Sequence, residues 1–208
     1  MSKRCRNEVP QHWNNNQVCV VTAQFTGLEA QIYDIIQICI VPLDGFYEID
    51  STKQMFIANM QSRHNMIDKK YVKYKYNKCI ELMQSGVDPY FTADELEKWF
   101  EKIRVVDNRQ IMPLAYNWPL VASYLVDWLG FQTFNYIFSH EYRDIMPATI
   151  FCNDRAYWQM EDYPFPKTKL SYMANITKED YSLRYDIMQQ AIAISKIYKK
   201  MLIHYIGR

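Results

Sequence analysis

The sequence is poor in glycine and has no long hydrophobic run. Only five of its 208 residues are glycine while 49% are hydrophobic, so the composition excludes a glycine-rich disordered chain and favours a globular α/β domain. No run of 18 or more apolar residues occurs, and the sequence therefore predicts no membrane span and no membrane partner. The N-terminus, M-S-K-R-C-R-N-E, has no apolar segment behind it, so we expect no secretion signal and an intracellular, cytoplasmic location.

Charge of one sign is not in excess, and the cysteines form no motif. Lysine and arginine number 24 against 23 aspartates and glutamates, and this balance gives no evidence about nucleic acid because a local basic patch would be hidden in the sum. The cysteines are odd in number and widely spaced, which indicates reduced thiols: Cys5, Cys19, Cys39, Cys79 and Cys152. Neither they nor the four histidines have the spacing of a zinc site, so we expect no metal and no cofactor.

Residues 1–16 are polar and predict a flexible leader before a single domain at 17–208. Three apolar runs with strand character come first, with turns and no helix between them: Val18–Ala23, Ile35–Leu43 and Met55–Met60. We therefore expect the sheet to start as an antiparallel meander. Thr26-Gly27 ends the first run, and we expect Gly27 to adopt φ > 0 and to let another segment pass close by.

The rest of the chain alternates helical patterns with single strands. A helix is predicted at Ile67–Gln84, ending before Gly86, and the capping box Thr92–Glu95 predicts another that runs to Val105. The later patterns predict, in order, a strand at Ile111–Tyr116, a helix from Pro119 that stops at Gly130, a strand at Phe134–Phe138, a helix from Asp144 toward Asn153, a loop at Asn153–Lys169 and a helix at Arg184–Tyr205.

Four stretches in the right order carry a resemblance to a known family. They are V-V-T-A-Q-F-T-G-L at 20–28, L-A-Y-N-W-P-L-V-A-S-Y-L at 114–125, Y-R-D-I-M at 142–146 with L-S-Y-M at 170–173, and Y-D-I-M-Q-Q-A at 185–191. They resemble the motifs of the DnaQ-like (DEDD) 3′–5′ exonucleases, and the resemblance runs from about Val18 to Leu202. It implies the ribonuclease H-like α/β fold, with a mixed central sheet that starts with three antiparallel strands, continues with parallel strands and is flanked by helices.

In that family four carboxylates hold two divalent ions about 3.5–4 Å apart, and a histidine positions or activates the attacking water. Carried over position by position, the carboxylates fall on Thr22, Gln24, Val121 and Gln190, and the histidine falls on Tyr185. Magnesium and manganese require hard oxygen ligands, which an amide or alkyl group does not replace. The resemblance therefore implies a degenerate site with no catalytic residue and no bound metal, in a pseudo-enzyme.

Three other carboxylates could serve as replacement ligands in a residual nuclease. These are Glu29, Asp144 and Asp186, of which Asp186 comes into play if the last motif slides along its helix. We interpret Asp144 as a residue that opens a helix, because its position in the family chiefly does so and aspartate is a favoured N-cap.

The segment 69–78 interleaves five lysines with three tyrosines, which suits phosphate contact combined with base stacking. The alternative is a solvated helix face whose tyrosines cover the sheet and whose lysine stems lie over apolar surface. Trp118 could stack on a base or pack against the terminal helix. The candidates for nucleic-acid binding are Lys69, Lys70, Lys73, Lys75, Asn117 and Trp118.

These features favour a catalytically inactive exonuclease-like protein that binds single-stranded nucleic acid, or that serves as an accessory subunit beside another protein of a replication, repair or transcription assembly. Whether the nucleic acid is DNA or RNA stays open, as does a host-cell location if the source is viral. The alternatives are a protein-interaction scaffold without nucleic-acid binding and the residual nuclease. Four aromatic residues are candidates for a partner-binding patch, or for covering the core: Tyr157, Trp158, Tyr163 and Phe165.

Overall fold

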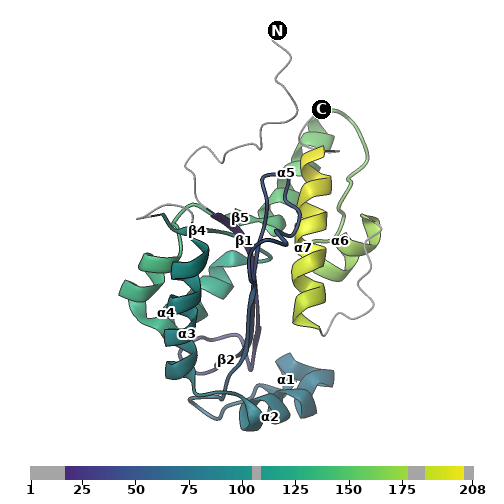
Figure 1. Ribbon diagram of the computed structural model, residues 1–208. Coiled ribbons are helices and arrows are strands. Elements are labelled where there is room, and N and C mark those ends of the chain that lie inside the picture. The colour runs from purple at the N-terminus through teal and green to yellow at the C-terminus, as the bar shows by residue number, and fades with distance from the viewer. Residues whose placement is uncertain (1–16, 105–108, 178–185, 204–208) are drawn as a thin grey trace.

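The computed structural model describes residues 17–104, 109–177 and 186–203, and it contains a five-stranded mixed sheet with helices on both faces (Figure 1). The strands, in the order β3-β2-β1-β4-β5, are β3 (Phe56–Asn59), β2 (Ile35–Pro42), β1 (Gln17–Phe25), β4 (Ile111–Ala115) and β5 (Arg143–Asp144). β1 pairs antiparallel with β2 and β2 with β3, whereas β1–β4 and β4–β5 are parallel. The predicted fold class, with its antiparallel start and parallel continuation, is confirmed.

The helices divide between the two faces and one end of the sheet. α3 and α4 lie on one face of the sheet, and α5, α6 and α7 lie on the other. α1 and α2 lie at the lower end of the sheet in this view, below α7 (Figure 1). Their bounds are α1 (Lys69–Val72), the 3-10 turn η1 (Lys73–Lys75), α2 (Tyr76–Ser85), α3 (Pro89–Ile103), α4 (Trp118–Ile137), α5 (Ile145–Trp158), α6 (Leu170–Ile176) and α7 (Ile187–Met201). In the described part of the chain, no helix is both long enough and apolar enough to cross a bilayer.

The apolar run of β1 is continuous because both faces of this strand are buried. Cys19 and Val21 belong to the core cluster that contains residues of α3 and α4, while Val18 and Val20 belong to the cluster that contains residues of α5 and α7. Side chains alternate across a strand, so a strand covered on both faces needs hydrophobic residues at every position. This places β1 at the centre of the fold.

The predicted strand at Phe134–Phe138 is wrong. α4 continues to Ile137 across a kink at Gly130, whose φ of 77° and ψ of 157° are non-helical. Phe134 and Ile137, three residues apart, are buried on the core side of the second segment, as a helix requires. Of the predicted strand only Phe138 makes a β-bridge, to Ile111.

The predicted capping box is also wrong, because α3 begins one turn earlier. The Asp88 carboxylate accepts hydrogen bonds from the backbone N–H groups of Tyr90 and Phe91, at 2.8 and 3.0 Å, and Pro89 occupies the first turn. Thr92 lies inside the helix, where its hydroxyl donates to the Asp88 carbonyl at 2.9 Å. Pro89 was the stronger start signal, since its φ suits the first turn and its missing N–H costs nothing there.

Other boundaries differ in smaller ways. The helix predicted at Ile67–Gln84 is broken at Lys73, whose φ is 44°, although it ends before Gly86 as expected. α5 extends to Trp158, six residues into the predicted loop, and α6 was not expected as a helix. The terminal helix begins at Ile187 with Asp186 as its N-cap, while the leader at 1–16 and the ends of the predicted Arg184–Tyr205 helix lie outside the described residues.

Gly27 does not adopt a positive φ, so that expectation is wrong, but the close approach is real. A Cβ atom built on Gly27 would lie 2.2 Å from the ring of Tyr33, and any larger residue would push this ring away. The Gly27 carbonyl accepts a hydrogen bond from the Tyr124 hydroxyl at 2.8 Å, which ties the end of β1 to α4. Glycine is therefore required here for space rather than for backbone conformation.

Candidate functional site

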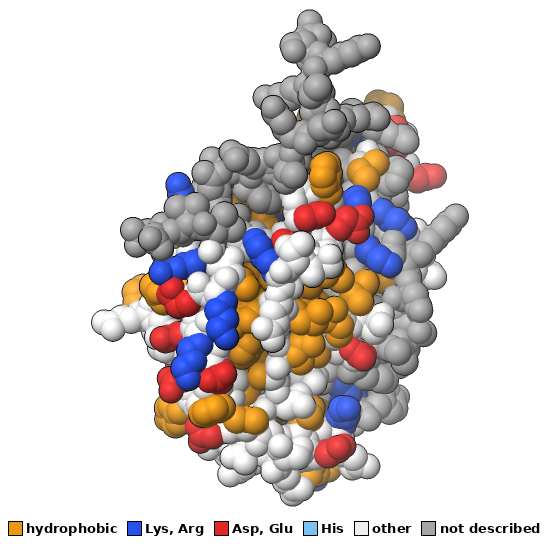
Figure 2. Space-filling view, viewed as in Figure 1, with side chains coloured by type: hydrophobic (Ala, Val, Ile, Leu, Met, Phe, Trp, Pro, Cys, Tyr) orange, Lys and Arg blue, Asp and Glu red, His pale blue; other side chains and the backbone are white. Residues whose placement is uncertain are grey.

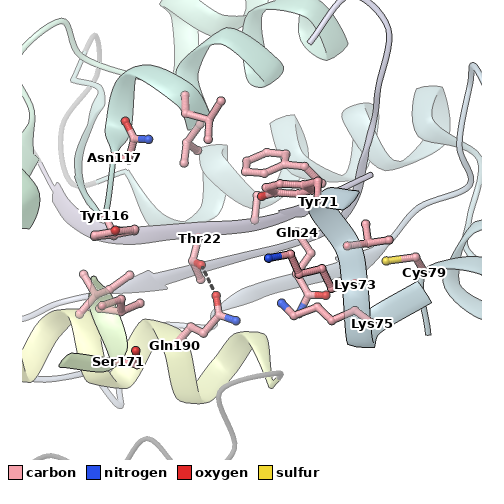
Figure 3. A pocket seen from close by; sticks show the side chains of 17 residues that line it. Thr22, Gln24, Tyr71, Lys73, Lys75, Cys79, Tyr116, Asn117, Ser171 and Gln190 are labelled. Atoms are coloured by element: carbon pink, nitrogen blue, oxygen red, sulfur yellow. Dashed lines mark hydrogen bonds between the residues drawn. The ribbon is translucent and has the colours of Figure 1, made fainter. Parts of the chain in front are cut away.

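A cavity of about 480 Å³ opens beside the C-terminal half of β1 (Figure 3). Its walls come from β1, α1 and η1, the β4–α4 junction, and the helices α6 and α7. Segments from both ends of the chain therefore meet here. Its volume falls within the range of about 300–1,000 Å³ that is typical of small-molecule sites.

Four of the five positions that the sequence predicts to form a degenerate site line this cavity. Thr22 and Gln24 come from β1, Val121 from the first turn of α4 and Gln190 from α7. The Thr22 hydroxyl donates to the side-chain oxygen of Gln190 at 3.3 Å, which joins β1 to α7 across the cavity (Figure 3). The fifth position, Tyr185, lies outside the described residues.

Asp144 organises the β4–α4 junction at one wall of the cavity. Its carboxylate accepts hydrogen bonds from the backbone N–H groups of Asn117 at 2.9 Å, Trp118 at 2.7 Å and Met146 at 2.9 Å. The bond to Met146 makes Asp144 the N-cap of α5, which confirms its interpretation as a helix cap. The other two bonds hold Asn117, which lines the cavity, in the left-handed conformation with φ 60° and ψ 59°.

Trp118 does not line the cavity, which corrects its assignment as a nucleic-acid-binding candidate. Its side chain is 4% exposed, so neither face of the indole is available to a base. The ring packs near those of Phe134, Phe138 and Tyr142, with centroid separations of 6.2, 5.7 and 6.3 Å. Packing against the terminal helix is not its role either, because these partners belong to α4 and the segment that follows it.

The lysine-rich segment contributes two of its lysines to the cavity. Lys73 and Lys75 line it beside Gln24, whereas Lys69 and Lys70 do not (Figure 3). The Lys69 ammonium lies 5.3 Å from the ring centroid of Tyr76, over the ring face. The break at Lys73 separates the two pairs, because residues on either side of it no longer follow one helical path.

The cavity wall carries no acidic side chain among the described residues. Burial raises the pKa of the Tyr71 phenol, and burial, followed by the nearby Asp144, raises that of Tyr116. Burial also raises the pKa of the Cys79 thiol, against the effect of Lys75. These three lining groups are therefore uncharged at neutral pH, and the charge of the wall comes from lysine.

The donor set does not fit a pair of divalent ions. Hydroxyl, amide and alkyl groups occupy the positions on which the motif resemblance places the family's carboxylates, and the described part of the chain contains no group of three or more His, Cys, Asp or Glu that could hold a metal. The possible replacement ligands lie elsewhere: Asp186 caps α7 through the N–H groups of Met188 and Gln189, and neither Glu29 nor Asp144 lines the cavity.

A second polar cluster near the end of β1 was missed by the sequence reasoning. We call Asp34, Ser62, Arg63, His64 and Asp127 the Asp34 cluster. The Asp34 side chain is 2% exposed and accepts from Ser62 at 2.6 Å, from Arg63 Nε at 3.0 Å and from the His64 backbone N–H at 2.8 Å. Arg63 also pairs with Asp127 of α4. The sequence feature that could have indicated this cluster is the position of Asp34, directly before the apolar strand β2.

Burial alone would raise the pKa of Asp34, but the hydrogen bonds from Ser62 and the His64 backbone, together with the charge of Arg63, outweigh burial and lower it. The carboxylate is thus ionised at neutral pH and held on both oxygens. Its place is the junction of β1, the β3–α1 connection and α4, so the cluster fastens these segments together rather than facing the cavity.

Comparison with known proteins identifies the fold. No family model matches the sequence, and no curated protein matches it. Among solved structures, the chain is similar to E. coli exonuclease I in a zinc-bound complex with single-stranded DNA, with a TM-score of 0.72, 10% identity, and coverage of 92% of this chain and 42% of that one. The chain therefore spans about two fifths of the length of that exonuclease.

Two smaller nucleases give the same result. The nuclease domain of 3′hExo, a DEDDh family member bound to rAMP, has a TM-score of 0.65 at 13% identity, with 90% of this chain and 92% of that one covered. Cell-death related nuclease 4 (CRN-4) has a TM-score of 0.64 at 11% identity, with 90% and 64% covered. The described chain therefore has the ribonuclease H-like fold of the DnaQ-like (DEDD) exonucleases.

Proposed function

We propose that this protein is a catalytically inactive exonuclease homologue that binds single-stranded nucleic acid in the cavity without a metal ion. The single observation that carries the proposal is the composition of the cavity wall. Thr22, Gln24, Val121 and Gln190 lie together there, and Lys73 and Lys75 lie beside them. A two-metal reaction needs carboxylates in such a place, whereas binding alone does not.

The physical reason is charge balance around a phosphate. In a two-metal site, divalent ions neutralise the carboxylates and the phosphodiester together. Here the described wall has no carboxylate to neutralise, so two lysine ammonium groups suffice to attract a phosphate directly. The amides of Gln24, Asn117 and Gln190 can both donate and accept, which suits the sugar hydroxyls and base edges of a strand end.

The structural neighbours support a strand end as the ligand. One of them was solved with single-stranded DNA and another with rAMP. The fold is thus compatible with a nucleotide ligand. We further propose an accessory role beside another protein of a replication, repair or transcription assembly.

The surface in Figure 2 bears on where the strand binds. On this face Lys, Arg, Asp and Glu side chains are intermixed along the flanks, and hydrophobic side chains gather between them. Mixed signs do not make the continuous basic surface that a phosphate backbone favours. The lysines at the cavity are therefore better candidates for phosphate contact than the flanks of this face.

The test is fluorescence anisotropy with 5′-labelled single-stranded DNA and RNA oligonucleotides in EDTA. We expect binding that weakens steeply with salt, and we expect Lys73→Ala/Lys75→Ala to reduce the slope of log K against log[salt] by about 1.4, or about 0.7 for each lost phosphate contact. Lys70→Ala/Lys78→Ala is the matched control, because both lysines belong to the same segment and neither lines the cavity.

Two outcomes would overturn the proposal. Metal-dependent shortening of the labelled strand by the wild-type chain would show that the reaction survives. No binding of either oligonucleotide at low salt would instead favour the protein-interaction scaffold, in which the cavity has only an architectural role.

A further inference from the structure

The strongest feature outside the cavity is an exposed group of large side chains at the end of α5. We call Tyr157, Trp158, Met160, Glu161, Asp162 and Tyr163 the α5-end surface. Its four large side chains are exposed by 68% for Tyr157, 84% for Trp158, 97% for Met160 and 54% for Tyr163. Large apolar side chains this exposed and this close together indicate a binding surface. None of the six residues lines the cavity.

The backbone that carries this surface is well fixed. Asn153 of α5 binds both backbone groups of Phe165: its side-chain nitrogen donates to the Phe165 carbonyl at 2.7 Å, and its oxygen accepts from the Phe165 N–H at 3.0 Å. Phe165 is fully buried, so among the four aromatic residues singled out in the sequence it alone covers the core. The segment after α5 is thus fastened at Phe165, and its other aromatic residues are held outward.

Met160 occupies a position that usually belongs to glycine. α5 ends in a Schellman motif, in which the Glu161 N–H donates to the Ala156 carbonyl at 2.9 Å and Met160 has a left-handed φ of 56°. A side chain in this conformation is disfavoured relative to glycine, and a side chain that is 97% exposed gains nothing by burial in its own chain. Met160 therefore projects into solvent from a turn whose backbone is fixed by helix hydrogen bonds.

The same turn encloses a shallow hollow of about 340 Å³. It is lined by Tyr157, Met160 and Tyr163 together with two carboxylates, Glu161 and Asp162. No ion pair between described residues involves either carboxylate. Two tyrosine rings and a thioether beside two carboxylates match the side chain of arginine or lysine, whose apolar stem lies on rings while its cation meets carboxylate.

We propose that the α5-end surface binds a partner protein by taking up one arginine or lysine side chain in this hollow, with flanking apolar residues of the partner covering Trp158 and Met160. Charge complementarity selects this occupant. Aromatic rings alone would also suit unpaired bases, but two adjacent carboxylates repel a phosphate backbone. The proposal is independent of what the cavity binds.

The test uses ¹⁹F NMR on chain labelled with 5-fluorotryptophan, in which the Trp158 resonance is assigned by Trp158→Phe. The probe is acetyl-Leu-Arg-Leu-amide, titrated to millimolar concentration, with the same peptide carrying glutamine or glutamate in place of arginine. We expect the Trp158 resonance to shift with the arginine peptide and not with the other two. Glu161→Gln/Asp162→Asn should weaken the binding at least about tenfold, as loss of charge-assisted contacts does.

The matched control is Asp94→Asn/Glu95→Gln, which removes two carboxylates from α3, far along the chain from the α5-end surface. It should leave the titration unchanged. Equal shifts with the glutamine peptide, or no shift of Trp158 with any peptide, would overturn the proposal. So would concentration-dependent dimerisation in sedimentation that Trp158→Ser abolishes, because the occupant would then be a second copy of this chain.

Discussion

The cavity and the Asp34 cluster both contain polar side chains near the end of β1, yet they differ in how those side chains are used. In the Asp34 cluster a carboxylate with a 2% exposed side chain receives donors on both oxygens, and Arg63 extends the network to Asp127. In the cavity, the hydrogen bond from Thr22 to Gln190 is long, at 3.3 Å, and the wall surrounds about 480 Å³ of space. The buried acid serves the fold, whereas the polar side chains of the cavity wall border open space.

The largest expected loss of stability comes from a substitution in the Asp34 cluster. Asp34→Asn removes one of the two carboxylates that pair with Arg63 and should lower the free energy of unfolding by about 3 kcal/mol, the lower end of the range found when one partner of a buried pair is lost. Urea denaturation measures the loss. Glu95→Gln, whose partner Lys98 is an exposed i,i+3 neighbour, is the control and should change the free energy by less than about 0.5 kcal/mol. Equal losses in the two variants would contradict the structural role of Asp34.

The same variant has a defined pH signature. The pKa of Asp34 is lower in the folded chain than in the unfolded chain, so its contribution is fully present above the unfolded value of about 3.9 and is lost as pH falls through the lowered folded value. Wild type should therefore lose stability toward acid more steeply than Asp34→Asn. Parallel curves of unfolding free energy against pH below pH 5 would contradict the lowered pKa.

A substitution of Asp144 should lower the free energy of unfolding by less than one of Asp34 and by more than one in the cavity wall. Asp144→Ala leaves the N–H groups of Asn117, Trp118 and Met146 without their acceptor and should cost about 2 kcal/mol. Asp186→Ala is the matched control, because Asp186 caps only its own helix and should cost about 1 kcal/mol. Since Asn117 lines the cavity, only the Asp144 variant should also weaken oligonucleotide binding. A smaller loss of unfolding free energy for Asp144→Ala than for Asp186→Ala would contradict the role of Asp144 in connecting the β4–α4 junction to α5.

Some parts of the fold and of the site could be predicted from the sequence, and others could not. Patterns at β1 and β2 were strong because both strands are buried on both faces, and the motif resemblance brought Thr22, Gln24, Val121 and Gln190 to one place. Phe134–Phe138 failed because a short run of aromatic and apolar residues suits a strand as well as a helix. What decides is the conformation at Gly130, whose φ of 77° and ψ of 157° kink the chain and let a second helical segment follow.

The positions of individual side chains at the site depend on backbone geometry that the residue types do not predict. Lys73 has a positive φ without being glycine or asparagine, so nothing in the sequence separated Lys73 and Lys75 from the two lysines before them. The Asp34 cluster draws on residues up to 93 positions apart, from Asp34 to Asp127, and only the folded chain brings them together. Long-range polar networks of this kind have no periodic signature.

The smallest effect on stability is expected for a substitution in the cavity wall. Its result distinguishes a cavity that binds a ligand from one that has only an architectural role. Thr22→Val keeps the shape of the side chain and removes the 3.3 Å hydrogen bond to Gln190, so it should lower the free energy of unfolding by less than about 1 kcal/mol while changing the affinity for a single-stranded oligonucleotide. Urea denaturation and anisotropy measure the two quantities on the same preparation. A loss as large as that of Asp34→Asn, with no effect on binding, would make the cavity wall an architectural element and favour the scaffold. A small loss with altered binding would separate the cavity from the Asp34 cluster, because a ligand and not the fold would then account for its polar side chains.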